Sequence, residues 1–487
     1  MSDRKMRILF LNGPCARKFA RTGRWQATAR GASLWYPIWL AHAAALARAR
    51  GFEIRLWDAP AAGWDLGETL RRAREWKPDL AVIDTSTASI HADLETARGL
   101  KEILGSTGVV CLVGPHASAV PEDVAGRPGV DAVAIGEYDV TVCELAERLR
   151  AGVPEPGRVP GLLWNSGGYI ISNIQRPLIP DLDLLPFASD ILLEQLDPAW
   201  YGLDFCLHPY MTIMTARGCP SHCTFCLWPQ TLTRGTYRVR SLDHVFAEIE
   251  RVLARRPRIR ELFFDDDTFT VNPARLEEFA DRYHALPHRV PFSVNARAVP
   301  LPENVFRKLV RAGLRCVVVG FESGNQAILD AVRKGTRLEE MVRFAEQCDA
   351  LGVQVHGDFV LGLPGETPAT IEQTVRFATR LPLSTFQLAI AHPLPGTAFF
   401  DWLNHNGYLI TRDFSQWIDS DGNQQAVIRY PGLGPGEMKT AVATSLRDYY
   451  LSPAFLARAC RNVLRQPGEL RRYVRGGLRF FRLVLGA

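Results

Sequence analysis

Residues 217–226, which read Arg-Gly-Cys-Pro-Ser-His-Cys-Thr-Phe-Cys, say the most about how this chain folds. They place Cys219, Cys223 and Cys226 in a Cys-x3-Cys-x2-Cys arrangement directly after an expected strand. Thiolates are soft ligands that favour iron–sulfur, zinc or copper(I) centres, and three in one loop can hold one metal centre. A cubane cluster on three cysteines leaves one iron open to a small chelating ligand. The stretch therefore predicts a 4Fe–4S cluster.

A structural zinc site is the alternative for the same cysteines, with Cys206 or His222 as the fourth ligand. Structural zinc usually takes its four ligands from two separated pairs. The loop also follows the first strand of an expected barrel, where an active site is normally found. Both observations favour a cluster over a zinc-binding module without catalytic function.

The cysteine loop belongs to the second of two alternating series of strands and helices. Its expected strands are Met211–Ala216, Glu261–Asp265, Phe292–Asn295, Cys316–Phe321, Gln354–Leu361 and Thr385–Ile390. Six such units are too few for the usual eight-stranded barrel, so residues 206–400 predict an open, partial (βα)6 barrel. Residues 401–487 predict a mainly helical region that ends in a basic amphipathic helix.

Residues 1–150 form the earlier alternating series, which predicts a doubly wound, Rossmann-like α/β domain. Its expected strands are Arg7–Leu11, Glu53–Trp57, Leu80–Thr85, Val109–Val113 and Ala132–Ile135. Ligands of such sheets bind at the carboxyl ends of the strands, where this chain carries small or polar residues. Residues 151–205 predict a linker with a hairpin around Ser166-Gly167-Gly168.

Each expected barrel strand ends in a polar or glycine-rich motif, including Asp265-Asp266-Asp267-Thr268, Gly320-Phe321-Glu322-Ser323-Gly324 and Gly362-Leu363-Pro364-Gly365-Glu366. Alone, each motif is typical of a turn or a helix cap. Together, in this order, they resemble the radical S-adenosylmethionine (SAM) superfamily, whose open iron is chelated by SAM and whose reductive cleavage of SAM yields a 5′-deoxyadenosyl radical. The resemblance implies SAM contacts for Phe225, Asp266, Asp267, Asn295, Arg297, Glu322 and Gly362.

A doubly wound domain before such a barrel resembles the cobalamin-binding subfamily. The resemblance implies cobalamin contacts for Thr85, Ser86, Gly114, His116, Gly136 and Glu137. The chain lacks the Asp-x-His-x-x-Gly signature, so binding without a histidine ligand to cobalt is implied. A sheet that binds nothing and only covers the barrel is the alternative. No Gly-x-Gly-x-x-Gly or phosphate-loop lysine motif indicates a nucleotide instead.

Several strings are similar to a narrower family, the hopanoid-biosynthesis radical SAM proteins. They are Trp35–Pro37, Cys226–Thr231, Tyr237–Ser241, Phe263–Thr270 and Gly357–Thr367. The resemblance implies ring contraction of a sugar head group on a hopanoid lipid, with a flavodoxin or ferredoxin as electron donor. The chain departs from the family at Thr233-Arg234-Gly235, where a Gly-Gly-type turn is expected. Cobalamin-dependent radical methylation is the alternative activity. The sequence does not identify substrate acid or base residues.

Charge is distributed unevenly along the chain. The whole sequence has a net charge of +5, but eight arginines and a single acid, Glu469, lie between Leu456 and the end. On a helical wheel one side of the tail is apolar and the other basic, as in an interfacial membrane helix, and packing of the tail on the barrel is the alternative. The apolar side has Leu470, Val474, Leu478, Phe481, Val484 and Leu485, and the basic side has Arg471, Arg472, Arg475, Arg479 and Arg482. No nucleic-acid-binding motif accompanies the charge.

Composition excludes two broad classes of protein. The 487 residues are 47% hydrophobic and 22% charged, which excludes a mainly disordered chain. Most of the ten cysteines are scattered, unlike those of a disulfide-stapled secreted fold. The first residues read as a strand rather than a signal peptide, and no apolar stretch has membrane-spanning length. We expect a cytoplasmic enzyme that touches the inner face of the cell membrane through its tail.

Overall fold

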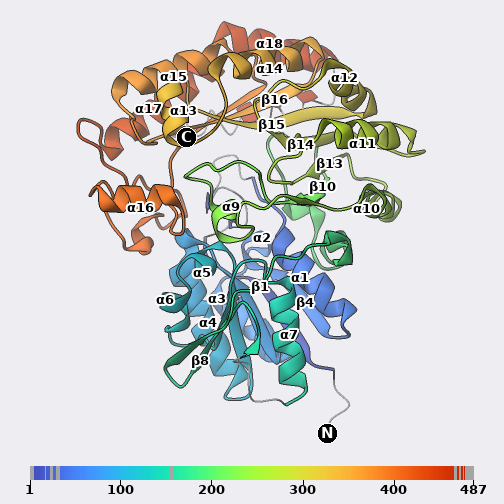
Figure 1. Cartoon of the computed structure of the whole chain (residues 1–487), viewed down its shortest axis with the longest axis vertical. Helices are drawn as coiled ribbons and strands as arrows, with labels where there is room; N and C mark the ends of the chain where they lie inside the picture. Colours follow the sequence, from blue (N-terminus) through green and yellow to red (C-terminus); the bar gives the residue numbers. More distant parts are fainter. Residues whose placement is uncertain are drawn as a thin grey trace.

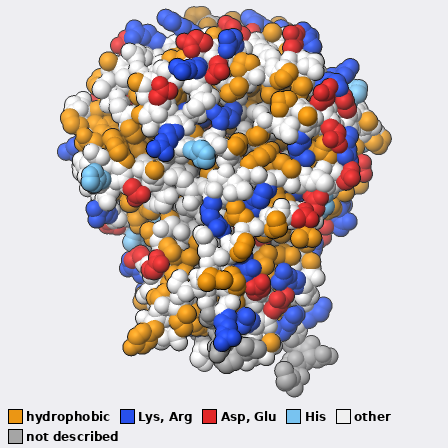
Figure 2. All heavy atoms as spheres, viewed as in Figure 1, with side chains coloured by type: hydrophobic (Ala, Val, Ile, Leu, Met, Phe, Trp, Pro, Cys, Tyr) orange, Lys and Arg blue, Asp and Glu red, His pale blue; other side chains and the backbone are white. Residues whose placement is uncertain are grey.

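The computed structural model describes residues 5–16, 18–21, 26–28, 33–152, 158–465, 469–470, 473–474 and 476–477. Two largely parallel sheets lie one above the other in Figure 1, the N-terminal sheet below and the second sheet above. Figure 2 shows basic and acidic side chains intermingled over the face in view, so neither sign dominates that face.

The lower sheet has the strand order β4-β1-β5-β6-β7-β8-β9. Its first five strands in this order are parallel and almost wholly buried, which confirms the doubly wound prediction. The order reverses between β1 and β5, the position at which doubly wound sheets bind their ligands. The strands are β1 (Arg7–Asn12), β4 (Glu53–Asp58), β5 (Leu80–Asp84), β6 (Val109–Val113), β7 (Ala132–Ala134), β8 (Leu162–Ser166) and β9 (Tyr169–Ser172).

Helices cover both faces of this sheet because successive strand residues point to opposite sides. Ile8 and Phe10 pack in the core with α1 and α7, whereas Leu9 and Leu11 pack in a separate core with α3 and α4. The predicted hairpin is present as β8 and β9, and it extends the sheet through antiparallel pairing with β7. The helices are α1 (Ile38–Ala49), α2 (Ala59–Ala62), α3 (Leu66–Trp76), α4 (Ile90–Leu104), α5 (Pro115–Ala119), α6 (Pro121–Ala125) and α7 (Asp139–Arg150), and a short β2–β3 pair spans Phe19–Ala20 and Ala27–Thr28.

The upper sheet has six parallel strands in the order β10-β13-β14-β15-β16-β17. No pairing joins β17 back to β10, so the predicted open barrel is confirmed. The strands are β10 (Tyr210–Ile213), β13 (Glu261–Phe264), β14 (Phe292–Ala296), β15 (Leu314–Glu322), β16 (Gln354–Leu361) and β17 (Thr385–Ile390). The helices between them are α9 (Leu227–Thr231), α10 (Leu242–Arg255), α11 (Pro273–Ala285), α12 (Glu303–Ala312), α13 (Gln326–Ala331), α14 (Leu338–Ala350) and α15 (Pro368–Arg380).

The first barrel strand is shorter than predicted. The sequence predicts one strand over Met211–Ala216, but β10 ends at Ile213. The side chain of Asp266 accepts hydrogen bonds from the backbone N–H groups of Thr215 and Ala216, at 2.5 and 3.0 Å, which draws the chain away from the sheet. Ala216–Arg217 then forms a short antiparallel pair, β11, with β12 (Arg238–Val239).

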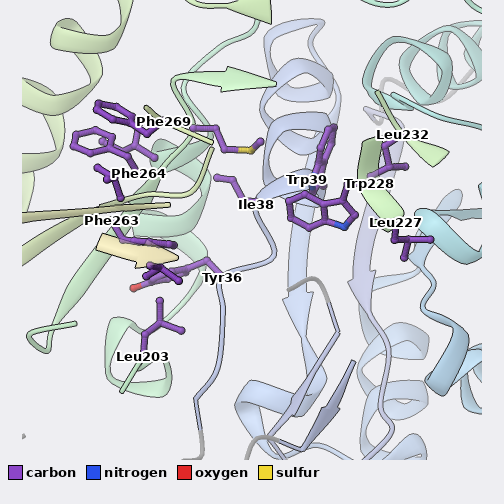
Figure 3. Packing of buried hydrophobic residues seen from close by; sticks show 14 of the residues in the cluster. Tyr36, Ile38, Trp39, Leu203, Leu227, Trp228, Leu232, Phe263, Phe264 and Phe269 are labelled. Atoms are coloured by element: carbon purple, nitrogen blue, oxygen red, sulfur yellow. The ribbon is translucent and has the colours of Figure 1, made fainter. Parts of the chain in front are cut away.

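One continuous core joins the two sheets. Tyr36, Ile38 and Trp39, at the start of α1, lie between aromatic residues of the barrel and residues of α9 (Figure 3). The Trp39 ring meets Trp228 edge-on with centroids 5.7 Å apart, and Tyr36 stacks on Tyr201 at 4.0 Å. The segment before β10, which includes α8 (Ala188–Gln195), also packs against α1.

The C-terminal region covers the open edge of the barrel. Helix α17 (Pro435–Tyr450) packs on β17, where the Tyr450 hydroxyl accepts a hydrogen bond from Phe386 N at 2.9 Å. Helices α16 (Ala398–His405) and α18 (Pro453–Arg465) complete this region. Most of the predicted basic helix lies outside the described residues. Glu469 is buried against the barrel and pairs with Arg315 at 2.9 Å. In the described ranges no helix is both long and apolar enough to span a bilayer.

Candidate active site

A cavity of about 1160 Å³ contains most of the residues that the sequence singles out in the barrel. Its lining comes from the β2–β3 segment, the cysteine loop, the inner faces of β15 to β17, residues 199–208 and helices α17 and α18. The cavity therefore connects the carboxyl ends of the barrel strands with the gap between the sheet edges.

All three loop cysteines line this cavity and are partly exposed. Gly218 precedes them with a positive φ of 86°, and a Cβ there would overlap the carbonyl oxygen of Thr236. Only glycine fits this backbone without strain, because it has no Cβ. Burial raises the pKa of the Cys223 thiol, and the positive charge of Lys334 offsets only part of this rise.

The cysteines, as the structure places them, are not gathered around a single metal ion. Within the part of the chain that the structure describes, no three His, Cys, Asp or Glu side chains form a group that could hold one metal ion. His222 is exposed and lies outside the cavity lining, so it does not complete a zinc site with the cysteines. A zinc ion needs thiolates within about 2.3 Å of one point, whereas a four-iron cluster binds thiolates that do not contact each other.

The side-chain amide of Gln230 fixes the cysteine loop, and Gln230 is not among the site residues predicted from the sequence. Its Nε2 donates to the carbonyl oxygens of Cys226, Thr224 and Cys223 at 2.8, 3.1 and 3.3 Å. Its Oε1 accepts from Ala398 N at 2.9 Å. The only signal in the sequence is the position of Gln230, four residues beyond the third cysteine on a short helix.

Two acidic residues that follow β13 have different roles. Asp266 is buried behind the loop, where Thr215 N and Thr215 Oγ1 each donate to it at 2.5 Å. Burial raises the pKa of Asp266 to about 6. Asp267 lines the cavity and accepts from Gly218 N at 3.1 Å. Asp266 therefore supports the loop, and Asp267 faces the space where a ligand would bind.

Charged side chains gather at the end of the cavity near the cysteines. Lys334 Nζ lies 2.7 Å from Glu322 Oε1, and both side chains are nearly buried. Glu322 has a φ of 66°, a strained conformation for a residue with a side chain, of the kind found at functional sites. Burial lowers the pKa of Lys334, but Glu322 raises it to above its ordinary value, so the lysine stays charged. Arg297 donates to Ser221 Oγ and, at 2.9 Å, to the carbonyl oxygen of Lys334.

Three predicted SAM contacts remain, of which two line the cavity and one does not. Phe225 and Asn295 line the cavity, and Asn295 Nδ2 donates to Asp265 Oδ1 at 3.1 Å. Gly362 lies behind the lining, where its carbonyl oxygen accepts from Tyr430 Oη at 2.8 Å and its N–H donates to Glu366 at 3.1 Å. Gly362 thus shapes the β16 loop from outside the cavity.

Glu366, which holds this loop, gives a pH-dependent prediction. Burial raises its pKa from 4.5 to about 7, so between these values the folded chain binds a proton that the unfolded chain lacks. This stabilising contribution is complete below pH 4.5 and disappears as pH rises through 7. We expect the free energy of unfolding of the wild type, measured in urea, to fall by up to about 3 kcal/mol relative to that of Glu366→Gln between pH 4.5 and 7. A difference independent of pH would contradict the assignment.

The predicted cobalamin residues gather at the carboxyl ends of β5 to β7 but lie outside the cavity lining. Thr85 Oγ1 donates to Val113 O at 2.7 Å, and His116 Nδ1 lies 3.0 Å from Thr87 Oγ1. The Glu137 carboxylate is paired with Arg238 of β12, whose Nη1 lies 2.9 Å from it. Ser86, Gly114 and Gly136 complete the edge with small residues.

This edge suits a large ligand with many polar groups. Buried polar atoms there have no protein partner: His116 Nε2, Tyr138 Oη and Asn12 Oδ1. Leaving a buried donor or acceptor unsatisfied costs about 1–3 kcal/mol, so such atoms usually mark a missing ligand or water. The β2–β3 segment of the same domain lines the cavity beside the cysteine loop. The residues present therefore fit cobalamin.

An ion-pair cluster joins this edge to the cysteine loop. Arg217, directly before the loop, binds both carboxylate oxygens of Asp139 at 2.8 and 3.1 Å and lies 3.6 Å from Glu137. Burial lowers the pKa of Arg217, but the two carboxylates raise it well above its usual range. The loop is therefore tied to the N-terminal domain at the residue where it begins.

Comparison with known families assigns both parts of the chain. Residues 213–378 match the radical SAM superfamily, and residues 26–146 match the B12 binding domain. The first range covers the open barrel up to α15, and the second covers the lower sheet from β4 to β7.

Three curated relatives share most of the chain. An uncharacterized methyltransferase of Pyrococcus horikoshii is 27% identical, with 91% of this chain and 94% of the relative aligned. An anaerobic magnesium-protoporphyrin IX monomethyl ester cyclase of Cereibacter sphaeroides is 26% identical over 92% and 72% of the two chains. The hopanoid C-3 methylase of Methylococcus capsulatus is 26% identical over 78% and 70%.

A solved structure has the same fold across both domains. The radical SAM methyltransferase TsrM from Kitasatospora setae, with cobalamin and a [4Fe–4S] cluster bound, superposes with a TM-score of 0.70. Its sequence is 19% identical, and 93% of this chain and 90% of TsrM are covered. The arrangement of a doubly wound domain against an open barrel is therefore shared by the two proteins.

Proposed function

This chain is a radical SAM enzyme with an N-terminal B12-binding domain, and we propose that it transfers a methyl group to a largely apolar substrate. Its cofactors are a [4Fe–4S] cluster, SAM and cobalamin. The observation that carries the proposal is the single cavity lined both by the three cysteines and by the β2–β3 segment of the B12-binding domain. A methyl carrier and a radical source need such a common space.

Each group of residues has a part in this activity. Cys219, Cys223 and Cys226 would hold the cluster, which with bound SAM supplies the radical, while cobalamin supplies a methyl carrier. Gln230 keeps the loop in one shape by binding three of its carbonyl groups. Asp267 presents a carboxylate at the other side of the same loop.

Methyl transfer has better support than the ring contraction implied by the sequence resemblance. Two of the three relatives described above, and the solved structure, are methyltransferases. The cyclase relative has a different activity on a comparable length of chain. A hopanoid lipid stays within the proposal as a substrate, because one relative is a hopanoid methylase.

The outer part of the cavity favours an apolar substrate. Helices α17 and α18 and the turn between them contribute a wall that is apolar except for Lys439, and its apolar members are Val442, Leu446, Tyr450, Leu451, Phe455, Leu456 and Ala459. Because the barrel is open, this wall faces residues 199–208 across the gap between the sheet edges. Binding of a long apolar molecule in such a channel would be favourable, because it removes apolar surface from water.

Product analysis tests the proposal. The anaerobically purified holoenzyme would be incubated with reductant, bacteriohopanetetrol with and without an amino-sugar head group, and SAM carrying a trideuterated methyl group. We expect S-adenosylhomocysteine and a labelled methyl group on the lipid. A rearranged lipid without label, formed with 5′-deoxyadenosine alone, would support ring contraction instead. A reduced flavodoxin or ferredoxin, the electron donor that we propose, is expected to replace the chemical reductant.

A membrane contact is part of the same proposal, and the described part of the C-terminus gives a way to test it. Leu464 and Leu470 are 83% and 55% exposed and belong to an arginine-rich stretch of the sequence. Burying a leucine contributes about 1.5–3 kcal/mol. We expect Leu464→Glu/Leu470→Glu to weaken co-sedimentation with phosphatidylglycerol vesicles at least about tenfold. Leu184→Glu, at a 70% exposed leucine on a different part of the fold, is the matched control and is expected to change nothing.

A further inference from the structure

We propose that His356 and Asp358 form a polar anchor inside the cavity, and that this anchor binds a hydroxyl or amino group on an otherwise apolar substrate. The inference builds on the proposed function by naming the kind of substrate group that the site accepts. His356 lies outside the strings on which the sequence resemblance rests, and Asp358 lies within Gly357–Thr367 without a role assigned by that resemblance.

The sheet register places the two side chains on the cavity side of β16. Residues two apart on a strand share a face, and both His356 and Asp358 line the cavity. His356 lies in register between Val318 of β15 and Thr385 of β17. Asp358 lies between Gly320 and Gln387 in the same way. Polar residues of β17, Thr385 and Gln387, therefore lie beside the two side chains, whereas β15 offers Val318 and Gly320 on the other side.

The histidine is fixed from both ring nitrogens. Its Nδ1 lies 2.6 Å from Thr385 Oγ1, and its Nε2 lies 3.2 Å from Asp358 Oδ1. The ring of Phe205 packs beside it with centroids 4.9 Å apart. The His356 side chain is only 9% exposed, whereas that of Asp358 is 32% exposed. The imidazole therefore orients the carboxylate, and the carboxylate keeps surface free toward the cavity.

The anchor lies near the cluster end of the cavity. A Cβ added to Gly320 would meet Glu322 Oε1 and would be 3.1 Å from Lys334 Nζ, so the Glu322–Lys334 pair lies directly over Gly320. Neighbouring strands are about 4.8 Å apart, which puts Asp358 next to this pair. Lys334 and Glu322 are in turn the charges that act most strongly on Cys223. A substrate group held by Asp358 is thus placed beside the reacting end of the cavity.

Of the carboxylates at the cysteine end of the cavity, Asp358 is the one placed to bind a polar group of the substrate. Glu322 is paired with Lys334 and Asp267 accepts from Gly218 N, whereas the interaction of Asp358 is with a histidine. An ionised carboxylate only accepts hydrogen bonds, so it favours hydroxyl or ammonium groups and repels carboxylates. With the apolar wall of α17 and α18, the site selects an amphiphile with a donor group at one end.

Three probes with the same tail test the anchor without requiring turnover: dodecylamine, dodecanol and dodecanoate, below their micelle-forming concentrations. Binding to the full-length holoenzyme would be measured by titration calorimetry. A hydrogen bond to a charged group contributes about 1.5–3 kcal/mol, so we expect dodecylamine to bind at least about tenfold more tightly than dodecanoate. Asp358→Asn should weaken dodecylamine about tenfold and leave dodecanoate binding equal or stronger.

The controls separate this inference from folding and from the proposed function. Asp401→Asn removes an exposed carboxylate on α16 and should keep the head-group preference. Iron content and thermal unfolding of Asp358→Asn report whether the variant is folded, and the comparison of probes in wild type does not depend on any variant. Equal affinity of wild type for the amine and the acid would overturn the anchor. Failure of methyl transfer alone would overturn only the proposed function.

Discussion

Replacing Cys223 by alanine is expected to abolish SAM cleavage and to remove most of the bound iron. The loop supplies three thiolates, and a cluster held by only two would expose a second iron to solvent and exchange. Anaerobically reconstituted wild type should contain roughly four irons per chain, with broad absorption near about 400 nm. For Cys223→Ala we expect iron to fall at least about tenfold and 5′-deoxyadenosine to fall below detection.

Cys460→Ala is the matched control, because this cysteine is exposed on α18 and lies outside the cavity lining. It should keep full iron content and activity. Gln230→Ala tests how the loop is held: the cysteines remain, but three carbonyl groups lose their shared donor. A Cys223→Ala protein that kept its iron and its SAM cleavage activity would contradict the assignment of the cluster to this loop.

Arg217→Ala is expected to cause the largest loss of stability. The guanidinium is buried and forms two hydrogen bonds with Asp139, so its removal leaves the buried Asp139 carboxylate without them, whereas Glu137 keeps its pair with Arg238. Removing one partner of a buried ion pair typically costs about 3–5 kcal/mol, because the other charge stays uncompensated. Arg217 also packs over the Trp39 ring at 4.5 Å, so the variant loses contact at the junction of the two domains.

Chemical unfolding of the holoenzyme measures this effect. Arg307→Ala is the control, because its partner Glu303 is on the same exposed helix and such surface pairs contribute less than about 1 kcal/mol. Arg217→Ala/Asp139→Leu should recover part of the loss, since it removes the carboxylate that lost its partner. An Arg217→Ala protein as stable as Arg307→Ala would show that the junction does not depend on this cluster.

The open barrel connects these predictions with the substrate. A closed barrel would fill its interior with side chains, whereas here six strands leave a gap that α17 and α18 border with apolar residues. The same opening gives His356 and Asp358 access to a ligand. The number of strands thus bears on which molecules reach the cysteine loop.

Most of the architecture follows from local sequence patterns. Buried strands such as Val109–Val113 and Gln354–Leu361 have the predicted bounds, because apolar runs between helical stretches are short-range signals. The strand over Met211–Ala216 was too long in the prediction, since the side chain that ends it, Asp266, comes from the next strand's loop. No local pattern contains that contact.

The two α/β units, the open barrel and the loop with its three cysteines can be predicted from the sequence, because each depends on spacing within a few residues. The surroundings of that loop depend on contacts that form only in the folded chain. Lys334 meets Glu322, Arg217 meets Asp139, and His356 meets Thr385 across strands and domains. These pairs arise from strand register and from the packing of two sheets into one core, which bring together residues that are far apart along the chain.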